Sequence, residues 1–510
     1  MDKNAEIDMK DVELNELDPE KQPMTGDVQA VGGEKNGSVK LKVPEEEVTF
    51  TGLSKEELMK VAGTPGWVRT RWVLLVLFWL GWVGMLAGAI VIIVQAPRCK
   101  PIPEMNWWNQ GPLYQISNFM SFSGGMADAE KKLDEINQLK VKAVVVGPLH
   151  TVQADMLETL DLKEVDPTHG TKQALVAVME KAHKKGISVV LDLTPNYLGS
   201  AHWFQQDKLT EVVERVKVAA EYWLNLGVDG IKISDFQEAS LSPDWSKFQA
   251  AVQGNRTEDT PNRLLMGVVE ASTATEVSEL VNTTGIDLVL SDLLNNNKGG
   301  VDYIKDMDAL HTVQRNVGWG LGAAQLDQLS KQAVSQSLIR LYQLLLFTMP
   351  GTPVFTYGDE IGLKSQGEKS PDMVWDLQDP AEGAVVNETA EAERKEHVAV
   401  RKWFRTLSEM RGKERSLLHG DYYSLHSSPN SLAFLRLWDQ SERYITAVNL
   451  GNKSETVTFK LAPTEEVKLP ATALVHLSTD SALEAESTVN LDKLELAPGQ
   501  GVLLKFPYMG

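Results

Sequence analysis

The chain has 510 residues, 43% hydrophobic and 24% charged, so it is long enough to bury a full core and to hold more than one domain. Its formal net charge of −20 argues against a nucleic-acid partner, because binding phosphates requires a basic face. With Cys99 as its single cysteine, the chain forms no intrachain disulfide, and its fold depends on its core.

The N-terminal segment, residues 1–71, is predicted to be a mostly disordered cytoplasmic tail. Residues 1 to about 50 mix charged and small residues with few aromatics, so they do not bury enough surface to fold alone. Residues 51–61 predict a short helix, in which Ser54 is the N-cap and Glu57 completes a capping box.

Residues 72–94 contain no charged side chain and predict one transmembrane helix, since roughly 20 apolar residues cross a bilayer core. A cleaved signal peptide is disfavoured, because 71 residues precede the run. Positive charge favours the cytoplasmic side, and the preceding flank holds Lys55, Lys60, Arg69 and Arg71, against Arg98 and Lys100 in the following one. We therefore expect a single-pass type II protein with a signal-anchor, a cytoplasmic N-terminus and an extracellular C-terminal part.

Small and aromatic residues within the run suggest packing against another helix. Gly84 and Gly88 form a G-x-x-x-G pair with Gly81 one turn earlier, which permits close approach, although glycine is also ordinary membrane-helix content. Trp79 and Trp82 suit either the membrane interface or such packing.

Beyond the helix, residues 95–105 are rich in proline and predict a short stiff connector. The N-x-S/T triplets that follow favour a glycosylated exterior, in contrast to a single triplet at Asn36 before the helix; they begin at Asn255, Asn282, Asn387 and Asn452.

Residues 106–410 alternate β-rich runs with helical stretches, which predicts an α/β fold with a parallel sheet closed into a (β/α)8 TIM barrel. The runs are residues 143–149, 188–196, 227–234, 264–270, 286–292 and 352–360. Near Arg411 the pattern changes to alternating segments separated by turns, so residues 411–510 predict a C-terminal antiparallel β-sandwich domain.

Ordered motifs in this region resemble the α-amylase family of glycoside hydrolases: LYQI at 113–116, DPTHGT at 166–171, LDLTPN at 191–196, GVDGIKI at 227–233 and PGTPVFTYGDEIG at 350–362. The resemblance implies the same barrel followed by an antiparallel domain. Retaining hydrolysis requires a carboxylate nucleophile and a carboxylic acid about 5 to 5.5 Å apart.

The positions that match the family's catalytic residues are degenerate. Ser234 stands at the nucleophile position and Lys232 replaces the arginine, while Asp235 comes one residue late, where strand alternation turns it away from the pocket. On the fifth strand Val268 stands at the general acid's position, and Glu270 follows the strand.

The remaining family motifs are also incomplete. The third-strand motif keeps Asp192 and Asn196 but has Tyr197 in place of its histidine, and residues 319–326 lack the seventh-strand N-H-D motif. Asp359 and Glu360 are expected to belong to the barrel scaffold. We therefore predict a barrel without catalytic activity, and no cofactor or metal.

Cys99 lies just beyond the membrane segment, in an oxidising compartment where an unpaired thiol tends to find an intermolecular partner. An interchain disulfide with a different subunit is favoured over a homodimer bridge or a free thiol.

The whole pattern resembles the heavy chains of heteromeric amino-acid transporters, on residues 12–24, 50–72, 78–94, 96–99, 341–355 and 413–423. This resemblance implies a glycoprotein linked through Cys99 to a multi-spanning light chain, which it brings to the plasma membrane for amino-acid exchange. It also implies an association with integrin β subunits. Transport must reside in the partner, since one uncharged helix forms no polar path.

Two other functions stay open. One is a membrane-anchored cell-surface α-glucosidase. The other is a carbohydrate-binding adhesion protein, in which Trp203, Phe204 and Tyr197 stack on a sugar or, alternatively, pack at the barrel rim.

Overall fold

The computed structural model describes residues 54–95, 99–254, 262–270, 273–333, 335–364, 370–378, 387–462 and 467–509. The chain divides into two compact units, residues 1–97 and 98–510. The segment predicted to be a disordered tail, residues 1 to about 50, lies outside the described residues.

The described part of the first unit consists of two helices. Helix α1 (Lys55–Ala62) begins after Ser54, whose hydroxyl accepts a hydrogen bond from Glu57 N at 3.4 Å while Ser54 N donates to Glu57 Oε2 at 3.3 Å. The predicted capping box is thus confirmed. Helix α2 (Pro65–Gln95) is, within the described ranges, the one helix long and apolar enough to cross a membrane.

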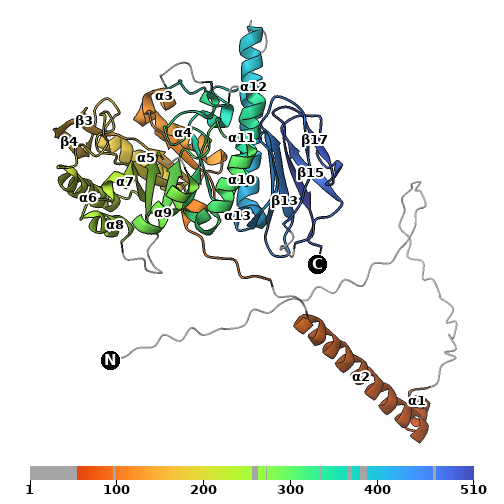
Figure 1. Cartoon of the computed structure of the whole chain (residues 1–510). Helices are drawn as coiled ribbons and strands as arrows, with labels where there is room; N and C mark the ends of the chain where they lie inside the picture. Colours follow the sequence, from red (N-terminus) through yellow and green to blue (C-terminus); the bar gives the residue numbers. More distant parts are fainter. Residues whose placement is uncertain are drawn as a thin grey trace, which may run out of the picture. The chain divides into compact units, whose positions relative to one another are not determined.

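The second unit begins with a closed barrel of parallel strands, which confirms the predicted fold class (Figure 1). In spatial order the strands are β1 (Leu113–Ile116), β10 (Thr352–Thr356), β9 (Val317–Trp319), β8 (Leu288–Ser291), β7 (Leu264–Val269), β6 (Gly230–Ser234), β5 (Ser188–Asp192) and β2 (Ala143–Val146). The helices of the connections are α3 (Phe119–Ser123), α4 (Met126–Gln138), α5 (Lys172–Lys184), α6 (Leu209–Asn225), α7 (Phe236–Ala239), α8 (Trp245–Gln253), α9 (Ala274–Thr284), α10 (Gly300–Ala309) and α11 (Gln336–Thr348). A hairpin of β3 (His150–Gln153) and β4 (Met156–Val165) follows β2.

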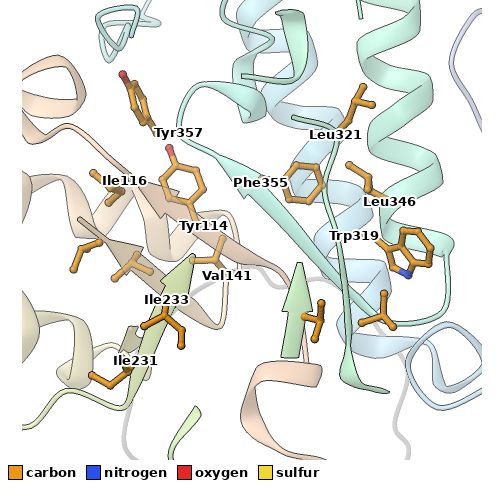
Figure 2. Packing of buried hydrophobic residues seen from close by; sticks show 14 of the residues in the cluster. Tyr114, Ile116, Val141, Ile231, Ile233, Trp319, Leu321, Leu346, Phe355 and Tyr357 are labelled. Carbon is orange, nitrogen blue, oxygen red and sulfur yellow. The ribbon is translucent and has the colours of Figure 1, made fainter. Parts of the chain in front are cut away.

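On most barrel strands, successive apolar side chains alternate between two clusters. On β6, Ile231 and Ile233 belong to the outer cluster, which the strands share with the surrounding helices (Figure 2). Because side chains alternate along a strand, Lys232 between them faces the barrel interior. The interior holds a separate cluster that includes Val145, Val190, Leu264, Met266, Val268, Leu288, Leu290 and Val354. The barrel is therefore filled by side chains, as expected for eight strands.

After the barrel, the long helix α12 (Glu388–Lys413) and the short α13 (Arg415–Leu418) lead to the antiparallel region (Figure 1). Its larger sheet has the order β11 (Asp421–Ser427), β12 (Ser431–Leu437), β13 (Arg443–Asn449), β18 (Gly501–Phe506), β15 (Thr472–Ser478) and β16 (Thr488–Asn490). A two-stranded sheet pairs β14 (Glu455–Val457) with β17 (Leu494–Leu496). Arg411, at which the sequence pattern changes, lies within α12.

Strand alternation gives the larger sheet two buried faces. Leu432 and Phe434 of β12 belong to the cluster shared with the barrel helices, whereas Ala433 and Leu435 belong to a core shared with the two-stranded sheet. The sheet is thus built onto the barrel by one face and completes its own small core with the other.

Candidate functional site

The residues predicted to stand at the family's catalytic positions lie at the carboxyl ends of β5 to β7. Asp192, the last residue of β5, is paired in register with Lys232 of β6, and Lys232 Nζ lies 2.9 Å from Asp192 Oδ2. Both side chains are 1% exposed. The other oxygen, Asp192 Oδ1, accepts hydrogen bonds from Thr194 N at 2.9 Å and Thr194 Oγ1 at 2.6 Å. The carboxylate is therefore fully engaged in an internal ion pair.

Ser234 ends β6 and is bound into the same rim through its backbone. Its N–H donates to Thr194 Oγ1 at 2.9 Å, and its carbonyl accepts from Trp203 Nε1 at 2.8 Å. Trp203 is buried, so its indole packs within the rim. At the predicted nucleophile position the chain therefore carries the hydroxyl group of Ser234, where the family has a carboxylate.

Asp235 follows β6 in the left-handed conformation, with φ 50° and ψ 40°, and precedes α7. Its Oδ2 lies 2.6 Å from His202 Nδ1. This hydrogen bond is the main cause that raises the pKa of His202, against the opposing effect of burial. The Asp235 carboxylate is thus held by the neighbouring ring of His202.

On β7, Val268 is 6% exposed and belongs to the apolar cluster of the barrel interior. Glu270 is exposed directly after the strand. Asp292, directly after β8, is a carboxyl group that the sequence analysis did not single out; burial first, and Glu270 second, raise its pKa. Gln325 donates a hydrogen bond to the Asp292 carboxyl group. The position of Asp292 directly after a buried strand could have marked it as a candidate site residue.

The third-strand motif residues tie the neighbouring hairpin to the barrel. Asn196 Nδ2 donates to Asp155 Oδ1 at 2.8 Å, and Asn196 Oδ1 accepts from Asp155 N at 3.0 Å. Tyr197 donates its hydroxyl to His150 O at 3.2 Å and packs edge to face on the His150 ring. These side chains are engaged in loop packing, and the half-buried Phe204 packs against the same outer cluster.

Asp359 and Glu360, after β10, are buried and bound to the barrel itself. Asp359 accepts from Leu329 N at 2.6 Å and Thr356 N at 2.8 Å. Glu360 accepts from the Tyr114 hydroxyl at 2.8 Å. Burial raises the pKa of both carboxyl groups.

Cys99 is exposed and carries a free thiol. The next residue is fixed to the antiparallel region, because Lys100 N donates to Asp439 Oδ2 at 3.1 Å. Lys100 Nζ also lies 4.0 Å from Asp421 Oδ2 and 5.9 Å from the centre of the Trp438 ring. The thiol thus stands beside an anchored residue and remains accessible.

Along α2 the predicted packing residues form two separate faces. At 100° per residue, Gly81, Gly84 and Gly88 fall within an arc of about 60°, whereas Trp79 and Trp82 lie on the opposite half of the helix. A Cβ built on any of these glycines would meet no atom within 4 Å. The glycine face is therefore open to a neighbouring helix.

Three of the predicted glycosylation asparagines are described and exposed. Asn282 lies in α9, Asn387 caps α12, and Asn452 lies in the turn after β13. Asn255 lies outside the described residues.

Comparison with known proteins gives a consistent result along the chain. Residues 38–114 match the family model for the solute carrier family 3 member 2 N-terminus, and residues 119–211 match that for the α-amylase catalytic domain. The chain is 41% identical to the amino acid transporter heavy chain SLC3A2 of Mus musculus over 100% of both chains. It is 22% identical to the heavy chain SLC3A1 of Rattus norvegicus over 92% of this chain and 89% of that one.

Among solved structures, the α-amylase of Geobacillus thermoleovorans in complex with acarbose superposes with a TM-score of 0.57 at 18% identity, covering 79% of this chain and 99% of that one. At this identity the likeness shows the barrel fold alone. The full-length match at 41% identity decides the family. This chain belongs to the family of amino-acid transporter heavy chains.

Proposed function

We propose that this protein is the non-catalytic heavy subunit of a heteromeric amino-acid transporter, joined through a Cys99 disulfide to a multi-spanning light chain that it brings to the plasma membrane. The match to heavy chains along the whole of both sequences carries the proposal. The exposed, unpaired Cys99 thiol supports the covalent link. The positive flank before α2 and the exposed Asn282, Asn387 and Asn452 support a cytoplasmic N-terminus and a glycosylated exterior.

We propose that the barrel has no catalytic activity because of the residues at the carboxyl ends of its strands. Ser234 and Val268 replace the two carboxylates of retaining hydrolysis, and Asp192 is neutralised by Lys232. We expect the purified full chain to leave an α-glucoside intact. Turnover that Asp235→Asn abolishes would instead establish a cell-surface α-glucosidase.

The disulfide is tested on non-reducing gels of membranes from cells that express the chain. The wild type should migrate as a larger complex that reductant dissolves, and Cys99→Ser should migrate as the single chain. Mass spectrometry of the larger band should identify a multi-spanning protein; a band containing this chain alone would mean a homodimer. A large complex that survives Cys99→Ser without reductant would refute the covalent link.

The membrane contact is proposed to use the glycine face of α2. Gly84→Leu and Gly88→Leu should reduce recovery of the light chain and amino-acid uptake, because the added side chains separate the two helices. Ala89→Leu places a leucine of the same final size about 100° from Gly88 and serves as the matched control. Equal losses in all three variants would contradict a specific glycine contact. Integrin association is tested by co-purification of integrin β subunits with the wild type.

A further inference from the structure

A second site lies at the opposite end of the barrel from Lys232 and Ser234. A cavity of about 140 Å³ opens where the amino-terminal ends of the strands meet the antiparallel region. From the barrel it is lined by Asn109 before β1, Arg315 before β9 and Gly351 before β10. None of the catalytic-position residues described above lines this cavity.

Two buried arginines form the wall between the barrel and the sheet, and each is 2% exposed. Arg411 of α12 donates hydrogen bonds to the carbonyls of Phe347 at 3.0 Å, Met349 at 2.8 Å and Gly351 at 2.6 Å. Arg436 of β12 donates to the carbonyls of Thr348 at 2.9 Å, and of Leu417 and Gly420 at 3.0 Å. Every one of these contacts is to a neutral carbonyl group.

The positive charge of this pair is only partly compensated. Nε of both arginines is buried without a hydrogen-bond partner in the described structure. Burial lowers the pKa of Arg411 to about 10, and burial and Arg411 together lower that of Arg436 more than Asp421 raises it. The carbonyl end of α11 supplies about half a negative charge. Two guanidinium groups therefore leave about one and a half positive charges before Asp421 is counted, and about half a charge after it, with the exposed Arg315 adding a further cation at the rim.

Three other side chains around the cavity differ in charge. His419 lines it with Nδ1 buried and without a partner among the described residues, and burial, followed by the nearby arginines, lowers its pKa, which favours the neutral ring. Arg315 adds an exposed cation at the rim. Among the residues that line the cavity, Asp421 carries the carboxylate. Its Oδ2 also lies 4.0 Å from Lys100 Nζ, so its negative charge is shared with that lysine.

We propose that this cavity binds one small monovalent inorganic anion, of which chloride is the abundant extracellular example, between Arg411 and Arg436. The volume suits an ion with a few waters and is below the roughly 300 Å³ at which sites for drug-sized ligands begin. Bound there, the anion joins α12 of the barrel to β12 of the sheet beside the anchored Lys100. It therefore stabilises the junction next to Cys99.

The test compares thermal unfolding of the detergent-solubilised full chain in sodium chloride and in sodium gluconate at equal ionic strength. Chloride should raise Tm by about 2–4 °C in a saturable manner, because a ligand that binds only the folded state stabilises it. Arg411 and Arg436 variants would disturb the junction itself. The variant of choice is therefore Arg315→Glu, which reverses an exposed rim charge, with Lys305→Glu in α10 as the matched control.

Arg315→Glu should shift the half-saturating chloride concentration upward at least tenfold, while Lys305→Glu should leave it within twofold of the wild type. A crystal grown in bromide should show anomalous density within the cavity. Equal Tm values in the two salts, an increase that does not saturate, or bromide found only on the outer surface would overturn the proposal.

Discussion

The buried ion pair at the barrel rim predicts an asymmetric response to substitution. Lys232→Met removes the ammonium from Asp192 and leaves a carboxylate that is 1% exposed. Breaking a buried pair typically costs about 3–5 kcal/mol. Because Asp192 Oδ1 keeps its two hydrogen bonds from Thr194, we expect Lys232→Met to lower the free energy of unfolding by about 3 kcal/mol, at the lower end of this range.

Asp192→Leu should lower the free energy of unfolding by more than Lys232→Met does. It removes the ammonium's hydrogen-bond partner and also the acceptor of both Thr194 bonds, which places the loss at the upper end, about 5 kcal/mol. The double variant Asp192→Leu/Lys232→Met leaves no buried charge, so its loss should be smaller than the sum of the single losses by at least about 2 kcal/mol.

The assay is equilibrium urea unfolding of the full chain, followed by circular dichroism, for the wild type, both single variants and the double variant. Lys131→Met, which removes an exposed lysine whose Nζ lies 2.7 Å from Asp128 Oδ1, is the control and should leave the free energy of unfolding almost unchanged. Additive losses, or a Lys232→Met loss as small as that of the control, would refute the idea that this pair is a structural element of the rim.

Three further outcomes are expected at the barrel. Val268→Glu should lower the free energy of unfolding by at least about 3 kcal/mol, because it buries a carboxylate in an apolar cluster; urea unfolding beside Val268→Ile checks this. Tyr114→Phe should cost about 1–3 kcal/mol, since Glu360 loses a buried 2.8 Å hydrogen bond, and an unchanged unfolding midpoint would contradict the contact. The raised pKa of His202 means that its pair with Asp235 stabilises the fold below pH 6.5, and that this contribution disappears as pH rises through the folded-state pKa. His202→Gln should therefore lower the free energy of unfolding by about 0.5–1 kcal/mol at pH 5.5 and by little at pH 9, as measured by urea unfolding at both pH values.

Local patterns in the sequence were sufficient to predict most barrel strands and the α1 cap. Strands such as β2 and β7 are runs of buried, mainly aliphatic residues, and Ser54 and Glu57 have the spacing of a capping box. Strand β9 gave no such signal, because it has three residues with Gly318 at its centre. The hairpin of β3 and β4 was also not predicted.

The site shows the same division between local and long-range information. Motif order placed Ser234, Lys232 and Val268 at the family's catalytic positions. The pairing of Lys232 with Asp192 depends on the register between β5 and β6, which no single segment encodes. Likewise Arg411 and Arg436 are ordinary surface-type residues in the sequence, and they become a buried pair only when α12 and β12 close against α11.

The two-faced β12 sheet has a consequence for the synthesis of this protein. When the ribosome has added residue 420, every barrel strand exists. Helix α10 still lacks its contacts with β11 and β12, α11 lacks those with β13 and β18, and Thr348 O lacks its hydrogen bond from Arg436. Exit of the nascent chain therefore exposes this surface until the sheet has been made. We predict that a chain terminated between barrel and sheet would be held by chaperones as an incomplete product, because this apolar surface would stay exposed.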